Sequence, residues 1–303
     1  SNVESKSVAI SADGKYIISG GAGGKIRFFS KDSSTPIWTA GLGSGHIYEV
    51  DISGDGEYAV ATYYSSGNGK IVLWNKASSS QLWSSSIDGG AYAIAISEDG
   101  EYIVTGSNSG SSDEKMYLFN KDSSTALWTY DLNAKLETVD ISANGEYIVV
   151  GEGSSNNKKV YLFDKDSSTP LWSYNAVNGV RSVSISEDGE YIIVGTAPSS
   201  DDTNLYLFDK DSSTPLWSYD IGPDDGQAAT SVAISADGKN IIVASRNDYA
   251  YAFKNSLAER PSIIPYGPRG GSEVETPVLR WFAGSDDRSN LTFDVYLDTN
   301  SSP

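Results

Sequence analysis

The sequence predicts an all-β protein built from one repeated unit. Five tryptophans, Trp38, Trp83, Trp128, Trp172 and Trp217, follow one another at steps of 45, 45, 44 and 45 residues. A Ser-x-Asp/Asn-Gly tetrapeptide occurs six times, beginning at Ser11, Ser53, Ser97, Ser142, Ser186 and Ser235. No segment sustains the i, i+3, i+4, i+7 apolar spacing of a helix. Repeats of this length, made of short strands, are typical of a β-propeller.

Each repeat divides into four short strands separated by turns. In the fifth repeat the strands are Arg181 to Ser186, Glu190 to Gly195, Asn204 to Asp209 and Pro215 to Asp220. Val, Ile, Tyr, Phe and Trp dominate them, as is usual in strands. The Asp-Gly between the first two strands supplies the positive φ of a tight hairpin. We therefore expect each tetrapeptide at the first hairpin of a blade and each spaced tryptophan on an outer strand.

The corner before the outer strand is also repeated. The twelve residues FDKDSSTPLWSY run from Phe163 to Tyr174 and again from Phe208 to Tyr219. The corner Asp can accept backbone N–H groups in an Asx turn, and Ser-Ser-Thr-Pro completes a rigid turn. The tryptophan offers apolar area for packing between blades, with an N–H that can still find a partner. A residue repeated in five blades is expected to have a structural role rather than to stack on a sugar.

These repeats resemble known propeller families. The strand order, with a tryptophan on the outer strand, is similar to WD40 and YVTN repeats. Asp164 to Trp172 resembles the tryptophan-docking motif of quinoprotein (PQQ-type) propellers, although Ser168 stands where that family has Gly. The similarity covers residues 7–256, and it is nearest to archaeal cell-surface propellers. Quinoprotein enzymes typically have eight blades, a calcium ion beside the cofactor and, in several, a vicinal disulfide, so six repeats without cysteine imply the architecture and not the chemistry.

The repeats define the domain organisation. We expect a propeller over residues 1–255, a Pro/Gly linker over 256–272 and a short β tail over 273–303. Two tail strands, Pro277 to Ala283 and Asn290 to Asp298, resemble the opening of a fibronectin type III domain. Alternatively the tail completes a blade, with Ser262 to Tyr266 as the missing outer strand of the sixth repeat. The sequence leaves open whether there are six or seven blades.

Composition narrows the function. The net charge of −18 argues against nucleic acid and anionic membrane surfaces as partners. Cysteine is absent and His46 is the only histidine, so a catalytic triad or a zinc site would lack parts. No apolar run is long enough for membrane insertion. Calcium is the one cofactor left open, at the acidic pairs Asp201–Asp202 and Asp224–Asp225.

The loops that vary between repeats are the candidate binding face, because loops on a rigid scaffold concentrate binding residues. Drift of unselected loops would produce the same variation. The candidate residues of this face are His46, Tyr48, Tyr63, Tyr64, Tyr92, Lys135, Glu137, Arg181, Asp224 and Arg246.

We expect a non-catalytic extracellular or cell-surface module for protein interaction, adhesion or surface assembly. Its partner would be a protein, a surface polymer or other copies of the chain. Two glycosylation sequons, at Asn290 and Asn300, favour an outside location slightly. The alternatives are an intracellular WD40-like scaffold and a quinoprotein-like dehydrogenase.

Overall fold

The structure is a computed structural model, and it describes residues 5–107, 114–153, 158–197, 204–221, 229–245 and 250–258. The chain divides into two units, Ser1–Asn255 and Ser256–Pro303. The first unit holds all the strands described below. The predicted tail strands, the linker and the sequons at Asn290 and Asn300 lie outside the described residues, so they stay predictions.

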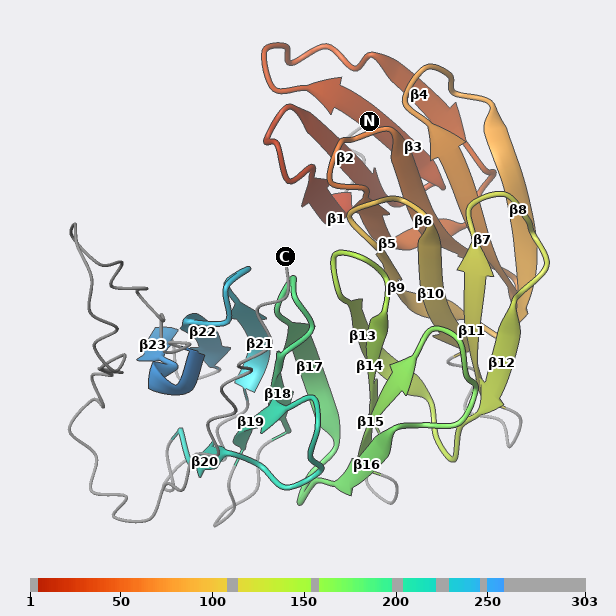
Figure 1. The fold of residues 1–303 in the computed structure, drawn as a ribbon. Coiled ribbons are helices and arrows are strands. Elements are labelled where there is room, and N and C mark those ends of the chain that lie inside the picture. Colours follow the sequence, from red (N-terminus) through yellow and green to blue (C-terminus); the bar gives the residue numbers. More distant parts are fainter. Residues whose placement is uncertain are drawn as a thin grey trace, which may run out of the picture. The chain divides into compact units, whose positions relative to one another are not determined.

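Six antiparallel sheets follow one another in chain order, and we number them as blades 1 to 6 (Figure 1). Blades 1 to 5 have four strands each, and the described part of blade 6 has three. Apart from the short 3-10 turn η1 (Ser256–Ala258), the described elements are all strands. The predicted all-β propeller fold is therefore confirmed.

Within each blade the strands run outward in sequence order. The inner strands are β1 (Ser5–Ile10), β5 (His46–Ile52), β9 (Ala91–Ile96), β13 (Leu136–Ile141), β17 (Val180–Ile185) and β21 (Ala229–Ile234). The second strands are β2 (Tyr16–Gly21), β6 (Tyr58–Ser65), β10 (Tyr102–Ser107), β14 (Tyr147–Glu152), β18 (Tyr191–Thr196) and β22 (Asn240–Ser245). The third strands are β3 (Lys25–Ser30), β7 (Asn68–Asn75), β11 (Lys115–Asn120), β15 (Lys159–Asp164), β19 (Leu205–Asp209) and β23 (Ala250–Lys254). The outer strands are β4 (Trp38–Gly41), β8 (Gln81–Asp88), β12 (Trp128–Asp131), β16 (Trp172–Asn175) and β20 (Trp217–Tyr219).

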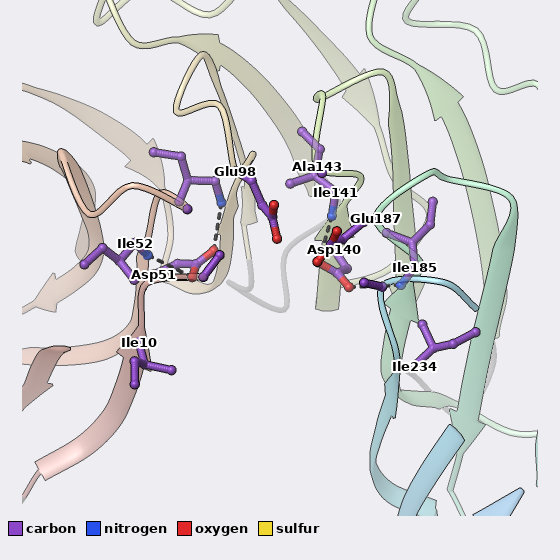
Figure 2. Close-up of a pocket in the computed structure, with 14 residues that line it drawn as sticks. Ile10, Asp51, Ile52, Glu98, Asp140, Ile141, Ala143, Ile185, Glu187 and Ile234 are labelled. Atoms are coloured by element: carbon purple, nitrogen blue, oxygen red, sulfur yellow. Dashed lines mark hydrogen bonds between the residues drawn. The ribbon is translucent and has the colours of Figure 1, made fainter. Parts of the chain in front are cut away.

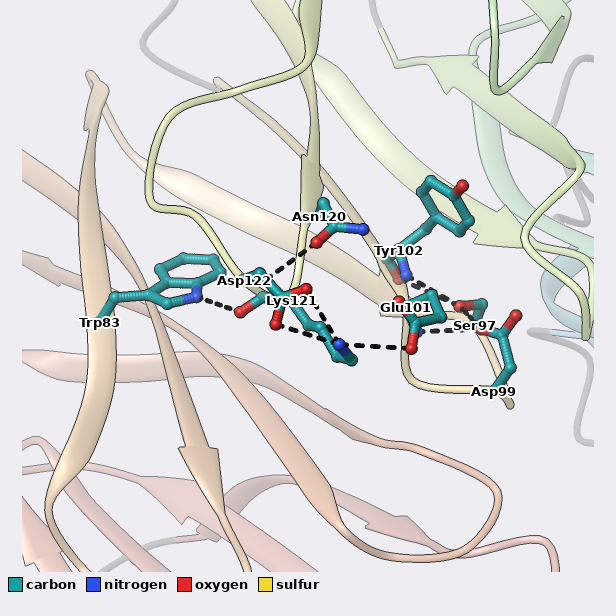
Figure 3. Close-up of polar contacts among 8 residues, drawn as sticks. All are labelled: Trp83, Ser97, Asp99, Glu101, Tyr102, Asn120, Lys121 and Asp122. Carbon is teal, nitrogen blue, oxygen red and sulfur yellow. Dashed lines mark hydrogen bonds and ion pairs between the residues drawn. The ribbon is translucent and has the colours of Figure 1, made fainter.

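The repeated tetrapeptide forms the hairpin between the first two strands, as predicted. In blade 3 the Ser97 hydroxyl donates to Asp99 Oδ1 at 2.5 Å and accepts the N–H of Tyr102 at 3.0 Å (Figure 3). Asp99 Oδ1 also accepts the N–H of Glu101 at 2.9 Å, and Gly100 has a φ of 73°. Serine, aspartate and glycine each therefore have a fixed task in the turn. We call the six turns together the turn rim.

The outer tryptophans join each blade to the next. Trp83 Nε1 donates to the carbonyl oxygen of Lys121 in the following blade at 2.6 Å (Figure 3). The same bond joins Trp38 to Lys76, Trp128 to Lys165 and Trp172 to Lys210, at 2.9, 2.7 and 2.7 Å. The corner residue before each lysine accepts a backbone N–H, as Asn120 Oδ1 does from Asp122 at 3.0 Å. Both tasks expected of the twelve-residue stretch are thus observed.

The core lies in the layers between successive sheets. Val60 of β6, for example, packs with Ile94 and Ile96 from the inner strand of the next blade. At the turn rim the tyrosine of each of blades 1 to 5 covers the next blade's glycine: a Cβ on Gly145 would lie 2.4 Å from the Tyr102 ring. Burial of these faces is the main stabilising contribution expected between blades.

Candidate functional site at the two mouths of the channel

The inner strands are tied together by side chains that accept backbone hydrogen bonds from the next blade. The acceptors are the residues four before the tetrapeptide serine. These bonds are Val50 N–H to Ser7 Oγ (3.1 Å), Ile94 N–H to Glu49 Oε2 (2.8 Å), Val183 N–H to Thr138 Oγ1 (3.2 Å) and Val232 N–H to Ser182 Oγ (3.1 Å). The polar atoms of these strands are therefore used for cohesion between blades.

Two aspartates make a second set of such bonds. Asp51 Oδ2 accepts the N–H of Ile96 at 2.9 Å, and Asp140 Oδ2 accepts the N–H of Ile185 at 3.0 Å. Burial raises the pKa of Asp51 to about 7 and that of Asp140 to about 6, although the hydrogen bonds from backbone N–H groups act in the opposite direction. Burial likewise raises the pKa of Glu49 to about 7.

A cavity of about 280 Å³ opens inside the turn rim (Figure 2). The last residue of each inner strand and the second residue of each tetrapeptide line it, in all six blades. Two of the tetrapeptide residues are the acids Glu98 and Glu187, and Asp51 and Asp140 lie deeper. Burial and the charge of Glu187 together raise the pKa of Glu98. The cavity is therefore acidic, and the carboxyl groups of Asp51, Asp140 and Glu98 hold their protons more tightly than exposed carboxyl groups do.

This cavity has the carboxylates of a site but not the ligand geometry of a metal centre. Among the described residues, no group of three or more His, Cys, Asp or Glu side chains is placed to hold a metal ion. In both Asp51 and Asp140, each carboxylate oxygen accepts a backbone N–H, because Oδ1 accepts the N–H of the following residue, at 2.8 Å in Asp51 and 2.9 Å in Asp140. The acidic pairs predicted as calcium ligands lie outside the described residues.

The opposite end of the inner strands carries the residue five before each tetrapeptide serine, and we call these six positions together the loop mouth. These residues are Lys6, Tyr48, Tyr92, Glu137, Arg181 and Thr230. They differ in chemistry from blade to blade, whereas the third residue before each serine is always Val or Ile and the residue directly before it is always Ile. Because successive inner strands are neighbours from β1 to β21, these six side chains occupy equivalent places at one end of the row of inner strands.

Blades 1 to 3 give the loop mouth an aromatic half. The rings of Tyr48 and Tyr92 meet edge to face with centroids 4.2 Å apart. The ring centroid of Tyr64 lies 6.4 Å from that of Tyr48 and 6.2 Å from that of Tyr92. The ring centroid of His46 lies 6.3 Å from that of Tyr48. Lys6 Nζ stands 5.0 Å from the centre of the Tyr48 ring. Burial and a hydrogen bond with Tyr48 raise the pKa of Tyr92 to about 12, so the Tyr92 hydroxyl stays neutral.

Blades 4 and 5 give the loop mouth an ionic half. Glu137 Oε1 lies 2.9 Å from Arg181 Nη1, across the boundary between the two blades. Glu137 Oε2 lies 2.6 Å from Lys135 Nζ. Arg181 remains exposed, so its guanidinium can still bind a ligand.

The structure brings together most of the residues predicted for the binding face. His46, Tyr48, Tyr64 and Tyr92 form one group, and Lys135, Glu137 and Arg181 form another. Tyr63 differs from them: it is buried, and its hydroxyl accepts the N–H of Gly45 at 3.1 Å, so it supports the loop beneath the surface. Asp224 and Arg246 lie outside the described residues.

Sequence reasoning missed several residues of the two mouths. At the loop mouth these are Lys6 and Thr230, and at the turn rim they are Asp51, Glu98, Asp140 and Glu187. The available signal was the alignment of the repeats with one another. In that alignment the acids replace small residues, such as Ala9 at the position of Asp51 and Ala12 at the position of Glu98.

Comparisons with known proteins agree with the fold. Models of three families match parts of the chain: the outer membrane protein assembly factor BamB over residues 22–155, a family of unknown function over 110–258, and the WD domain, G-beta repeat, over 3–30. A search of curated proteins gives no match. Among solved structures, a chain of Kuenenia stuttgartiensis hydrazine synthase superposes with a TM-score of 0.66 at 15% identity, over 83% of this chain and 84% of that one. A likeness at that identity concerns the fold alone.

The described residues include no helix with the length and hydropathy needed to cross a bilayer.

Proposed function

We propose that this chain of WD40-like and PQQ-like β-propeller repeats is a non-catalytic module that binds a segment of a partner protein at its loop mouth. The observation that carries the proposal is the variation among the six residues of the mouth, on strands whose third-last residue is always Val or Ile and whose last residue is always Ile. A row of equivalent places that holds lysine, two tyrosines, glutamate, arginine and threonine is asymmetric, as recognition of one oriented partner requires.

The residue types favour a protein as the partner. Tyrosine and arginine are enriched among the residues that dominate protein–protein binding energies. Tyr48, Tyr64 and Tyr92 offer apolar ring surface beside hydroxyl groups, at little cost in side-chain entropy. A segment with an apolar residue over this aromatic half and an acidic residue near Arg181 fits both halves of the mouth.

The proposal extends to the location of the protein. We place the module at the cell surface, in adhesion or surface assembly. The resemblance of the repeats to archaeal cell-surface propellers and the two sequons at Asn290 and Asn300 support this part.

A peptide-library selection on the immobilised full-length protein tests the binding site. Selected peptides are measured by fluorescence polarisation against the wild type, the double variant Tyr48→Ser/Tyr92→Ser and the control Tyr219→Ser, which removes an exposed tyrosine from an outer strand. Loss of a dominant contact of about 2 kcal/mol weakens binding about 30-fold. We expect this loss for the double variant and less than a twofold change for the control.

Three outcomes contradict the proposal. Peptides that bind the double variant as tightly as the wild type would place recognition elsewhere. Binding to a glycan array but to no peptide would make the partner a surface polymer. Alcohol oxidation that starts when pyrroloquinoline quinone and calcium are added would make the chain an enzyme.

A further inference from the structure

The first and last blades each present an apolar face that is far more exposed than the equivalent face of the other blades. On the inner strand of blade 1, Val8 is 67% exposed and Ile10 is 60% exposed. Their equivalents pack against the preceding blade. Eight of these equivalents are only 4% to 7% exposed, namely Val50, Ile52, Ile94, Ile96, Ile141, Val183, Ile185 and Val232, and the other two, Val139 and Ile234, are half-buried. The face of blade 1 that contains Val8 and Ile10 is hereafter the leading face.

Blade 6 has the complementary exposure on its other side. Ile242 of β22 is 59% exposed, whereas its equivalents Ile18, Val60, Val104, Val149 and Ile193 are fully buried. Within the chain, Ile193 packs with Ala229 and Val232 of the following blade. The face of blade 6 that contains Ile242 is hereafter the trailing face. β1 and β22 belong to the first and last sheets of Figure 1.

Hydrogen-bonding positions are matched in the same way. In four of the interfaces inside the described chain, a side chain of one blade accepts a backbone N–H of the next. By this register the exposed Ser231 of blade 6 occupies the acceptor position, and the N–H of Val8 occupies the donor position. At the turn rim, the second residue of a tetrapeptide donates its N–H to the carbonyl of the same residue in the next blade, as Glu187 does to Ala236 at 3.2 Å. By the same rule the N–H of Ala236 would donate to the carbonyl of Ala12 in a second copy.

We infer that the trailing face of one copy binds the leading face of a second copy, and that the chain thereby associates head to tail. Each of the blade interfaces inside the chain already joins a face of the trailing kind to one of the leading kind, so the contact continues an established interface. Every copy carries both faces, so no other component is required. The association is heterologous, and it grows beyond two copies unless its rotation closes a ring.

The contact between copies is weaker than the contacts inside the chain. Asn240 of blade 6 takes the place of the tyrosine that covers the next blade's glycine elsewhere. A Cβ on Gly14 would meet no atom within 4 Å, whereas one on Gly238 would lie 2.6 Å from the Tyr191 ring. The described part of blade 6 also lacks the outer strand that carries the tryptophan in the other blades. Association is therefore expected to depend strongly on concentration.

Sedimentation velocity of the full-length chain over a range of concentrations tests the inference. The wild type should rise from the 32.3 kDa of one chain through twice that mass to larger species. Val8→Asp and Ile242→Asp each place a charge on one exposed face, so both variants should fold, and each alone should stay a single chain. Leu171→Asp, a control at another exposed apolar residue, should associate like the wild type.

Mixing the two variants is the decisive experiment. The Ile242→Asp protein keeps its leading face and the Val8→Asp protein keeps its trailing face, so an equal mixture should form a one-to-one dimer and nothing larger. A wild type that stays a single chain at several hundred micromolar overturns the inference. So does dimerisation of either variant alone, or a mixture that remains monomeric while the wild type associates.

Discussion

The two ends of the channel are built from the same six inner strands, but their sequences follow different rules. At the turn rim the Ser-x-Asp/Asn-Gly turn is repeated with the same hydrogen bonds in each blade, as at Ser97 and Ser186. At the loop mouth the equivalent places range from Lys6 to Tyr92 to Glu137. The turn rim joins each blade to the next, so every copy of the turn needs the same packing and hydrogen bonds. The residues of the loop mouth are not under that requirement, and they are available for recognition.

Glycine substitutions at the turn rim should show the largest effect. Gly145 and Gly14 have similar φ angles of 72° and 66°, so alanine costs about 1 to 2 kcal/mol of backbone strain at either position. Only at Gly145 does the new Cβ meet a ring, that of Tyr102 at 2.4 Å. We expect Gly145→Ala to lose about 1 to 3 kcal/mol more unfolding free energy than Gly14→Ala in chemical denaturation. Equal losses would show that the tyrosine–glycine contact does not hold the blades together.

The buried aspartates should make the stability depend on pH. The folded state keeps protons on Asp51 up to about pH 7 and on Asp140 up to about pH 6, whereas the unfolded chain releases them near pH 3.8. Between these limits the folded state binds more protons, so the free energy of unfolding falls as pH rises from about 4 to 7 and levels off above that.

This slope can be assigned by substitution. Asp51→Asn/Asp140→Asn should make the fall shallower, as measured by thermal unfolding from pH 4.5 to 8, and the remainder is expected from Glu49, whose pKa is also raised to about 7. Asp131→Asn, at an exposed carboxylate, should leave the fall unchanged. A double variant with the slope of the wild type would assign the pH dependence to other groups.

Substitutions at the loop mouth should have the smallest effect on stability. Glu137 forms ion pairs with Lys135 and with the exposed Arg181, and surface pairs of this kind contribute about 0 to 1 kcal/mol. Glu137→Gln should therefore shift the unfolding midpoint by only a few degrees at most in differential scanning calorimetry. A loss as large as that of Gly145→Ala would mean that the ionic half of the mouth also holds the architecture together, and the contrast between the two ends would fail.

The fold could be predicted from the sequence because its determinants are local and repeated. The Asp-Gly turn and the tryptophan spacing each report on one blade, and six or five copies of each signal remove the ambiguity that a single copy would have. Prediction of the tight turn at Gly100 needed only its own tetrapeptide.

The sites were harder to predict because they depend on contacts between repeats. That Tyr48 meets Tyr92, 44 residues later, follows from the angle between two blades and not from either strand alone. Tyr63 and Tyr64 are adjacent in sequence and look equivalent, yet alternation along β6 buries the first and leaves the second at the mouth. In the sequence Asp140 cannot be distinguished from a surface aspartate, because the N–H that its carboxylate accepts belongs to Ile185 on the next inner strand.

The tryptophan bonds described for the outer strands also bear on how the chain acquires its structure. Each joins residues 37 or 38 positions apart, and the side-chain bonds between inner strands span 43 to 50 positions. A blade thus gains its docking partners as soon as one further repeat has left the ribosome. Cooperativity in such an array passes only between nearest neighbours, as in a one-dimensional chain of coupled units. Folding can therefore proceed vectorially, with each completed blade serving as the template on which the next one condenses.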